Sequence, residues 1–142
     1  MKKILFALFA MVSMTASAHV FDGIDLNQSY LKITREIATK GYIYDETKDC
    51  LKGNCQGTEI YLSFNLTDTK EKNKIGQLIV DIPMKNATAF EDAAMIFNVI
   101  YHVTNNAASQ KTYSVDTDGT TMDLIKTADG IKLVYSTPNY KK

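Results

Sequence analysis

Two cysteines and two histidines are the residues of this chain whose types could carry covalent or metal chemistry. Cys50 and Cys55 are separated by four residues, whereas redox centres use C-x-x-C and a zinc site needs four ligands. In an oxidising compartment a close pair favours a structural disulfide. A straight strand over residues 50–55 would hold the sulfurs about 17 Å apart, so the bridge needs a turn at Gly53. With that condition, we predict a Cys50–Cys55 disulfide.

The histidines define the alternative function. If His19 is the first residue after processing, its α-amine and imidazole could bind one copper ion, with His102 as a third nitrogen. The protein would then be a metal-binding protein or a metalloenzyme. No other residue pattern marks such a site, and we predict no resident metal and no cofactor.

Other catalytic patterns are missing from the sequence. There is no G-x-S-x-G nucleophile motif, and Glu91 and Asp92 are neighbours in the first turn of a predicted helix, where they point apart. Asp118-Gly119 favours a hairpin turn over a calcium loop, because the glycine is not at the sixth position of an EF-hand pattern. We therefore predict that the protein is not an enzyme.

Residues 1–18 have the pattern of a signal peptide. Lys2 and Lys3 precede an apolar stretch, and Ala16-Ser17-Ala18 is a small-residue cleavage site. Removing this segment leaves 14 basic against 16 acidic residues, a balance that favours neither nucleic acid nor an anionic membrane as a partner. We expect one domain, residues 19–142, that is periplasmic or secreted and does not insert into a membrane.

The strongest structural signal lies between Lys74 and Asn106. Leu78, Val80 and Ile82 alternate with polar or mixed residues, which predicts a strand with one apolar face, and Pro83 ends it. Thr88 and Glu91 have capping-box spacing, and apolar residues then recur at three- and four-residue steps as far as Thr104. The pattern predicts a long helix that covers a sheet.

The rest of the chain supplies a second helix and more strands. We expect a strand over 20–26, a helix capped by Asn27 and ended by Gly41, strands over 42–45 and 59–66, an exposed loop over 67–74, and a meander with Asp-Gly turns at 118–119 and 129–130. This order predicts an α+β fold, with two helices packed on one face of a mostly antiparallel sheet. Two α-β-β-β units in tandem and two unrelated units both fit it.

Several short motifs resemble a group of small exported bacterial proteins of unknown function. The residues that carry the resemblance are Phe21-Asp22-Gly23-Ile24-Asp25-Leu26, Lys40-Gly41-Tyr42, Leu51-x-Gly53 with Gly57, and Ile131-x-Leu133-x-Tyr135. Cys55 stands where that group usually has an aromatic residue. The resemblance implies a fold like that of the beta-lactamase inhibitor proteins, two helix–sheet units side by side, and a habit of binding proteins. It assigns no catalytic residue.

The functional hypothesis is placed on the face of the sheet opposite the apolar one. Strand alternation puts Glu59, Tyr61, Ile79 and Asp81 on that face, together with Ser63, Asn65 and Gln77. Tyrosine among polar neighbours suits protein recognition. We expect a non-enzymatic module, inhibitor- or immunity-like, that binds another exported protein there. A structural component of an envelope assembly is a further alternative.

Overall fold

The computed structural model describes residues 20–21, 24–25, 28–55, 57–66, 74–115 and 119–138. The predicted signal peptide, His19, residues 67–73 of the loop predicted over 67–74, and the segment 116–118 lie outside these residues. The helices are α2 (Tyr30–Thr39) and α3 (Ala89–Ile100). The strands, in chain order, are β1 (Val20–Phe21), β2 (Ile24–Asp25), β3 (Ile43–Asp45), β4 (Cys50–Cys55), β5 (Thr58–Leu66), β6 (Ile75–Pro83), β7 (His102–Asn106), β8 (Gln110–Ser114), β9 (Thr121–Lys126) and β10 (Gly130–Ser136).

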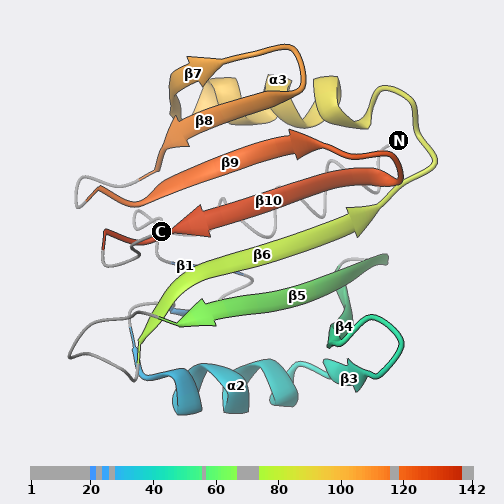
Figure 1. Ribbon diagram of the computed structural model, residues 1–142, viewed down its shortest axis with the longest axis vertical. Coiled ribbons are helices and arrows are strands. Elements are labelled where there is room, and N and C mark those ends of the chain that lie inside the picture. Colours follow the sequence, from blue (N-terminus) through green and yellow to red (C-terminus); the bar gives the residue numbers. More distant parts are fainter. Residues whose placement is uncertain are drawn as a thin grey trace.

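Eight of the described strands form one antiparallel sheet in the order β3-β4-β5-β6-β10-β9-β8-β7 (Figure 1). The α+β class is therefore confirmed. Each helix is followed by four strands, not three, because both the segment Cys50–Cys55 and the segment after α3 are extended. Of the predicted strand over 20–26, the described residues form two short strands, β1 and β2, which pair antiparallel.

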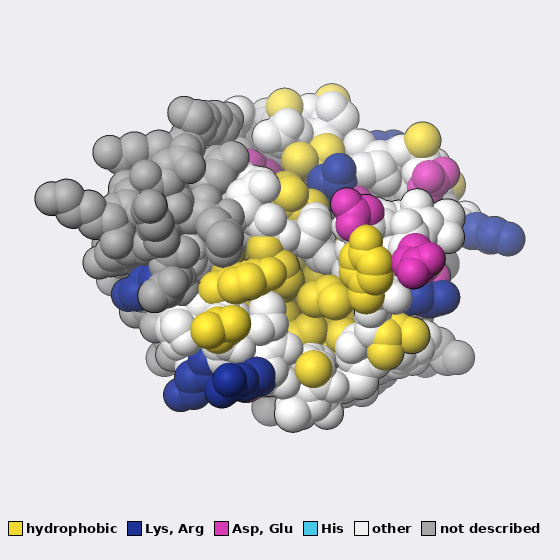
Figure 2. Space-filling model, turned by 60° about the horizontal axis from the view of Figure 1, so that its bottom comes forward, with side chains coloured by type: hydrophobic (Ala, Val, Ile, Leu, Met, Phe, Trp, Pro, Cys, Tyr) yellow, Lys and Arg dark blue, Asp and Glu magenta, His cyan; other side chains and the backbone are white. Residues whose placement is uncertain are grey.

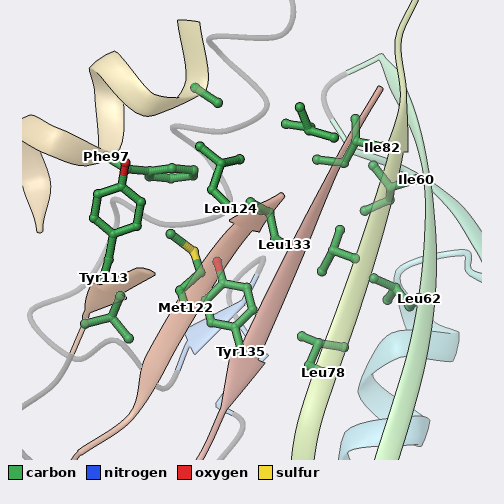
Figure 3. Close-up of a cluster of buried hydrophobic side chains, with 14 of the residues drawn as sticks. Ile60, Leu62, Leu78, Ile82, Phe97, Tyr113, Met122, Leu124, Leu133 and Tyr135 are labelled. Atoms are coloured by element: carbon green, nitrogen blue, oxygen red, sulfur yellow. The ribbon is translucent and has the colours of Figure 1, made fainter. Parts of the chain in front are cut away.

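The apolar face predicted for β5 and β6 is buried as expected. Leu78, Val80 and Ile82 are at most 1 % exposed, and Ile60 and Leu62 of β5 are equally buried. The cluster continues across β10, β9 and β8 through Leu133, Tyr135, Met122, Leu124 and Tyr113 (Figure 3). Because side chains alternate along each strand, every second residue of these strands points to the opposite face of the sheet.

α3 contacts the sheet through its buried stripe. Phe97 is fully buried, and its ring centroid lies 5.8 Å from that of Tyr113 in an edge-on arrangement. Lys126 of β9 forms an ion pair with Glu91 at 3.6 Å. At the other helix, the ring of Tyr30 meets Phe64 of β5 at 6.0 Å. Both helices thus place an aromatic or charged side chain against strands of the sheet.

α3 is shorter than the sequence predicted. It ends at Ile100, and Tyr101 has extended backbone angles that lead directly into β7. The apolar steps to Tyr101 and Thr104 fitted a helix, but the chain from His102 pairs with β8 instead. Val103 and Thr104 are β-branched, which favours this outcome. His102 therefore lies in a strand at the sheet edge, not in a helix.

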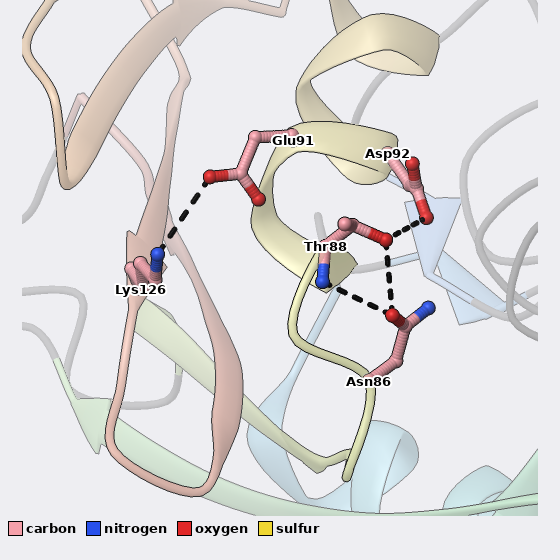
Figure 4. Close-up of polar contacts among 5 residues, drawn as sticks. All are labelled: Asn86, Thr88, Glu91, Asp92 and Lys126. Carbon is pink, nitrogen blue, oxygen red and sulfur yellow. Dashed lines mark hydrogen bonds and ion pairs between the residues drawn. The ribbon is translucent and has the colours of Figure 1, made fainter.

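The predicted capping box at Thr88 does not form. Thr88 is the N-cap residue, but its side chain makes no capping hydrogen bond to the helix backbone. Its Oγ1 instead lies 2.9 Å from Asn86 Oδ1 and 3.0 Å from Asp92 Oδ2, while Glu91 reaches Lys126 (Figure 4). The side chain that accepts a backbone hydrogen bond at this end of the helix is that of Asn86, whose Oδ1 accepts from the Thr88 N–H at 3.0 Å.

α2 also starts from a different cap. Ser29, rather than Asn27, is the N-cap residue, and its Oγ accepts a hydrogen bond from Lys32 N at 3.3 Å. Asn27 lies outside the described residues. Gly41 follows the helix with φ +91°, a conformation that glycine adopts without steric cost, as the sequence predicted.

Candidate functional site

Four charged or aromatic residues form a row across the middle of the sheet. The strand register places Lys52 of β4 opposite Tyr61 of β5, Tyr61 opposite Asp81 of β6, and Asp81 opposite Lys132 of β10. Residues paired in this way point to the same face. We call this face, opposite Leu62 and Val80, the polar face.

All four predicted binding residues lie on the polar face. Tyr61 and Asp81 are direct neighbours, Glu59 lies two positions along β5 from Tyr61, and Ile79 is paired with Ser63. The alternation rule therefore brought the right residues together. Their role in binding is a separate question.

Tyr61 is more buried than predicted. Its side chain is 7 % exposed, where the sequence analysis expected an exposed ring. The ammonium of Lys48, from the turn after β3, lies 4.2 Å from the ring centroid, within cation–π range. The Tyr61 hydroxyl donates a hydrogen bond to the Glu59 carboxylate. Lys48, which lies outside the strands, thus covers the ring of Tyr61, although strand alternation alone predicted that this ring would be exposed.

The acid–base properties of this cluster favour fixed protonation states. The hydrogen bond to Glu59 raises the pKa of Tyr61 to about 12, and the same bond lowers the pKa of Glu59. Burial, assisted by the nearby Asp45 carboxylate, raises the pKa of the Cys50 thiol. At neutral pH the cluster offers a neutral Tyr61 phenol, an ionised Glu59 carboxylate and a protonated Cys50 thiol. This set suits hydrogen bonding and is poorly suited to nucleophilic attack.

Two ion pairs flank Tyr61. Lys52 Nζ lies 3.7 Å from Glu59, and Lys132 Nζ lies 3.8 Å from Asp81. All four side chains are more than one-third exposed, so each pair contributes little to stability. Such half-exposed charges can exchange their partners for those of an approaching protein, which sets specificity and association rate.

Two grooves open beside this row. One, of about 510 Å³, is lined by Lys48, Tyr61, Asp81 and Lys132. The other, of about 340 Å³, lies between α2 and strands β3 to β5 and is mainly apolar, and Asp49, Cys50 and Ser63 line both. Figure 2 shows hydrophobic side chains gathered at this end of the molecule, with a basic group at lower left and a mixture of acidic and basic residues on the opposite side.

The apolar groove was not predicted from the sequence. Its helix side is formed by Tyr30, Thr34 and Ala38, which recur every four residues beside the buried stripe of Ile33 and Ile37. This four-residue spacing could have predicted the groove, because two adjacent stripes on one helix indicate that the helix has two surfaces for other parts of the molecule to contact.

Both cysteines lie in β4, at its two ends. Cys50 is a free thiol in the structure, and the side chain of Cys55 lies outside the described residues. β4 pairs continuously with β5 from Leu51 to Cys55, so the chain does not turn back at Gly53. Backbone positions five residues apart in a strand are about 17 Å apart. This is the geometry for which the sequence analysis expected no bridge.

Three further features of the described residues were candidates for a site. A cavity of about 530 Å³ lies at the start of α3 and includes Asn86, but Glu91 and Asp92 place negative charge in the first helical turn beside it. His102 is exposed at the sheet edge. Within the described residues, no three His, Cys, Asp or Glu side chains gather as metal ligands. Neither described helix has the length and hydropathy needed to span a bilayer.

Comparisons with family models, with curated proteins and with solved structures give no match to this chain.

Proposed function

We propose that this protein is an exported, non-enzymatic binding module that recognises another exported protein through the polar face around Tyr61. The observation that carries the proposal is the Tyr61 row, in which one nearly buried tyrosine lies between half-exposed charges of both signs. Protein interfaces commonly combine an ordered aromatic with a charged rim. An inhibitor or an immunity factor would use such a surface.

The surroundings of Tyr61 support recognition rather than catalysis. Its hydroxyl and the Glu59 carboxylate satisfy each other, so neither is a poised acid or base. Cys50 lines the groove beside Tyr61, and burial raises the pKa of its thiol. Ile79, which is half-buried and paired with the buried Val134 on the same face, adds an apolar contact.

The proposal includes a finer statement of the architecture. We infer that both helices cover the face opposite the polar one, and that the halves from α2 and from α3 are tandem units, as in the beta-lactamase inhibitor proteins. Support comes from Phe64 and Tyr113, the partners of Tyr30 and Phe97, which share that face by register. The sheet order is also symmetric about the β6–β10 pair. Export itself is proposed on the signal-like residues 1–18.

The test compares one substitution on the polar face with a matched substitution elsewhere. Ile79→Arg places a charge at the centre of the polar face, and Val99→Arg does the same on the outer side of α3, where Val99 is 85 % exposed. After crosslinking in the native envelope, Ile79→Arg should lose a discrete partner that wild type and Val99→Arg retain. Equal capture by all three proteins would refute the use of this face.

A further inference from the structure

Aromatic side chains line the apolar groove between α2 and strands β3 to β5. Among the described lining residues, four are aromatic: Tyr30 of α2, Tyr42, Tyr44 of β3 and Phe64 of β5. The rings of Tyr30 and Phe64 meet at 80°, so they form two sides of a corner. Tyr44 is 58 % exposed, which leaves much of its ring open to solvent. Aromatic rings carry negative charge on their faces, so a groove built from them attracts positive charge.

The deeper part of the groove is apolar. Ile37 and Leu62 line it and are at most 2 % exposed, and Leu51 is half-buried. A strongly hydrated ion would lose its water against these side chains without gaining hydrogen bonds. The groove volume of about 340 Å³ equals roughly eleven water molecules at about 30 Å³ each, so it suits a ligand of about ten non-hydrogen atoms.

Asp49 supplies the charge of the groove. Among the described lining residues it is the only Asp, Glu, Lys, Arg or His. Lys48, its neighbour in the sequence, lines the other groove, where its ammonium lies over the Tyr61 ring. The described lining therefore combines aromatic rings with one carboxylate and no basic side chain.

The turn between β3 and β4 holds Asp49 at the groove. Its backbone φ is +50°, a left-handed conformation that aspartate and asparagine adopt more readily than most residues. Asp45 Oδ1 accepts from Thr47 N at 2.9 Å and from Lys48 N at 3.2 Å, which fixes the start of the turn. The Tyr44 hydroxyl donates a hydrogen bond to the Asp49 carboxylate. The carboxylate and the exposed ring are thus positioned together before a ligand binds.

We propose that this groove binds a small quaternary ammonium compound, with the cation between the aromatic rings and the Asp49 carboxylate. A quaternary ammonium group carries its charge on an apolar surface of methyl groups, and aromatic cages recognise this kind of cation. A primary ammonium is strongly hydrated, and a divalent metal ion needs several oxygen ligands where the described lining offers one carboxylate. The inference goes beyond the proposed function and does not depend on it.

The test is an NMR titration of the protein, at constant ionic strength, with choline and with its uncharged analogue, in which a tert-butyl group replaces the trimethylammonium group. The two probes have the same shape and differ in charge. Choline should bind with a Kd of about 1 mM or lower. The analogue should bind at least about tenfold more weakly.

Substitutions at Tyr44 and Asp49 separate the ring, the hydroxyl and the charge. Tyr44→Leu removes the aromatic face and should weaken choline binding roughly two- to tenfold, whereas Tyr44→Phe keeps the ring and should bind within about twofold of wild type. Asp49→Asn keeps the backbone conformation and an acceptor for the Tyr44 hydroxyl but removes the charge, so it should weaken binding roughly fivefold. Val99→Arg, on the outer side of α3, should bind choline as wild type does.

Four results would overturn the proposal. The first three are no saturable shift with choline up to about 50 mM, equal binding of choline and its uncharged analogue, and choline binding that neither Tyr44→Leu nor Asp49→Asn changes. The fourth is equally tight binding of an acetylated lysine amide, which would assign the groove to a lysine side chain of a protein. Urea unfolding of each variant separates loss of the site from loss of folding, and the comparison of the two probes on wild type needs no variant.

Discussion

Gly53, in the middle of β4, offers the sharpest test of the packing around the candidate site. A Cβ atom added at this position would lie 2.3 Å from Cδ2 and 2.4 Å from Cε2 of the Tyr42 ring. Carbon atoms in contact are normally about 3.5–4.0 Å apart. Tyr42 is 5 % exposed, so its ring cannot move aside without disturbing the core.

Two opposing contributions determine how Gly53→Ala changes the free energy of unfolding. Gly53 has no positive φ, so alanine fits its backbone and would by itself stabilise the protein by about 0.4–1 kcal/mol through the unfolded state. Overpacking against Tyr42 costs roughly 1–3 kcal/mol. Gly53→Ala should therefore lower the free energy of unfolding by roughly 0–2.6 kcal/mol, with the middle of that range at about 1.3 kcal/mol.

A double-mutant cycle isolates the contact. In a Tyr42→Ala background the obstruction is gone, so Gly53→Ala should raise the free energy of unfolding by about 0.4–1 kcal/mol instead of lowering it. Urea unfolding of the four proteins, with linear extrapolation, measures both values. If Gly53→Ala destabilises both backgrounds equally, or stabilises the wild type, the inferred contact is wrong.

Three further predictions concern the core, the cysteines and Tyr61. Phe97→Ala should lower the free energy of unfolding by about 3–5 kcal/mol, because the cavity lies in a fully buried site; a loss below about 1 kcal/mol in urea unfolding would contradict this. Cys50 is a free thiol and begins the continuous β4, so maleimide labelling of denatured, unreduced protein should add a group at Cys50, and no group there if it is bridged. The raised pKa of Tyr61 means that its neutral form is favoured by folding, so its contribution to stability is complete below pH 10 and is lost as the pH rises towards 12. In tyrosinate absorbance, Tyr61→Phe should remove the step near pH 12, and an unchanged curve would count against the Glu59 bond.

Strand alternation was the reliable part of the sequence analysis. It placed Leu78, Val80 and Ile82 in the core and Tyr61 with Asp81 on the other face, because period-two patterns depend only on local geometry. The Asp-Gly turn at 129–130 was confirmed for the same reason, since β9 and β10 pair on either side of it.

The sequence-based predictions were wrong at positions whose structure depends on residues far away in the sequence. The sequence could not show that Lys48 would lie over Tyr61, because that contact depends on how the turn after β3 folds back. The chain after Ile100 had apolar spacing that fits a helix as well as a strand, and pairing with β8 selected the strand. β4 was missed because Gly53 and Asn54 are poor strand formers, yet Gly53 is the residue that makes room for the Tyr42 ring.

The order of the sheet has a consequence for how the chain folds. In the described sheet, every neighbouring pair joins strands that are consecutive in sequence, except β6 with β10. That pair brings Gln77 beside Ser136 and Pro83 beside Gly130. The two meanders on either side can form early from local contacts, whereas the seam between them requires closure of a long loop and is entropically slow. If the β6–β10 pair forms in the transition state, substitutions along these two strands should change the folding rate of the whole chain. If the pair forms after the transition state, the same substitutions should change the unfolding rate instead.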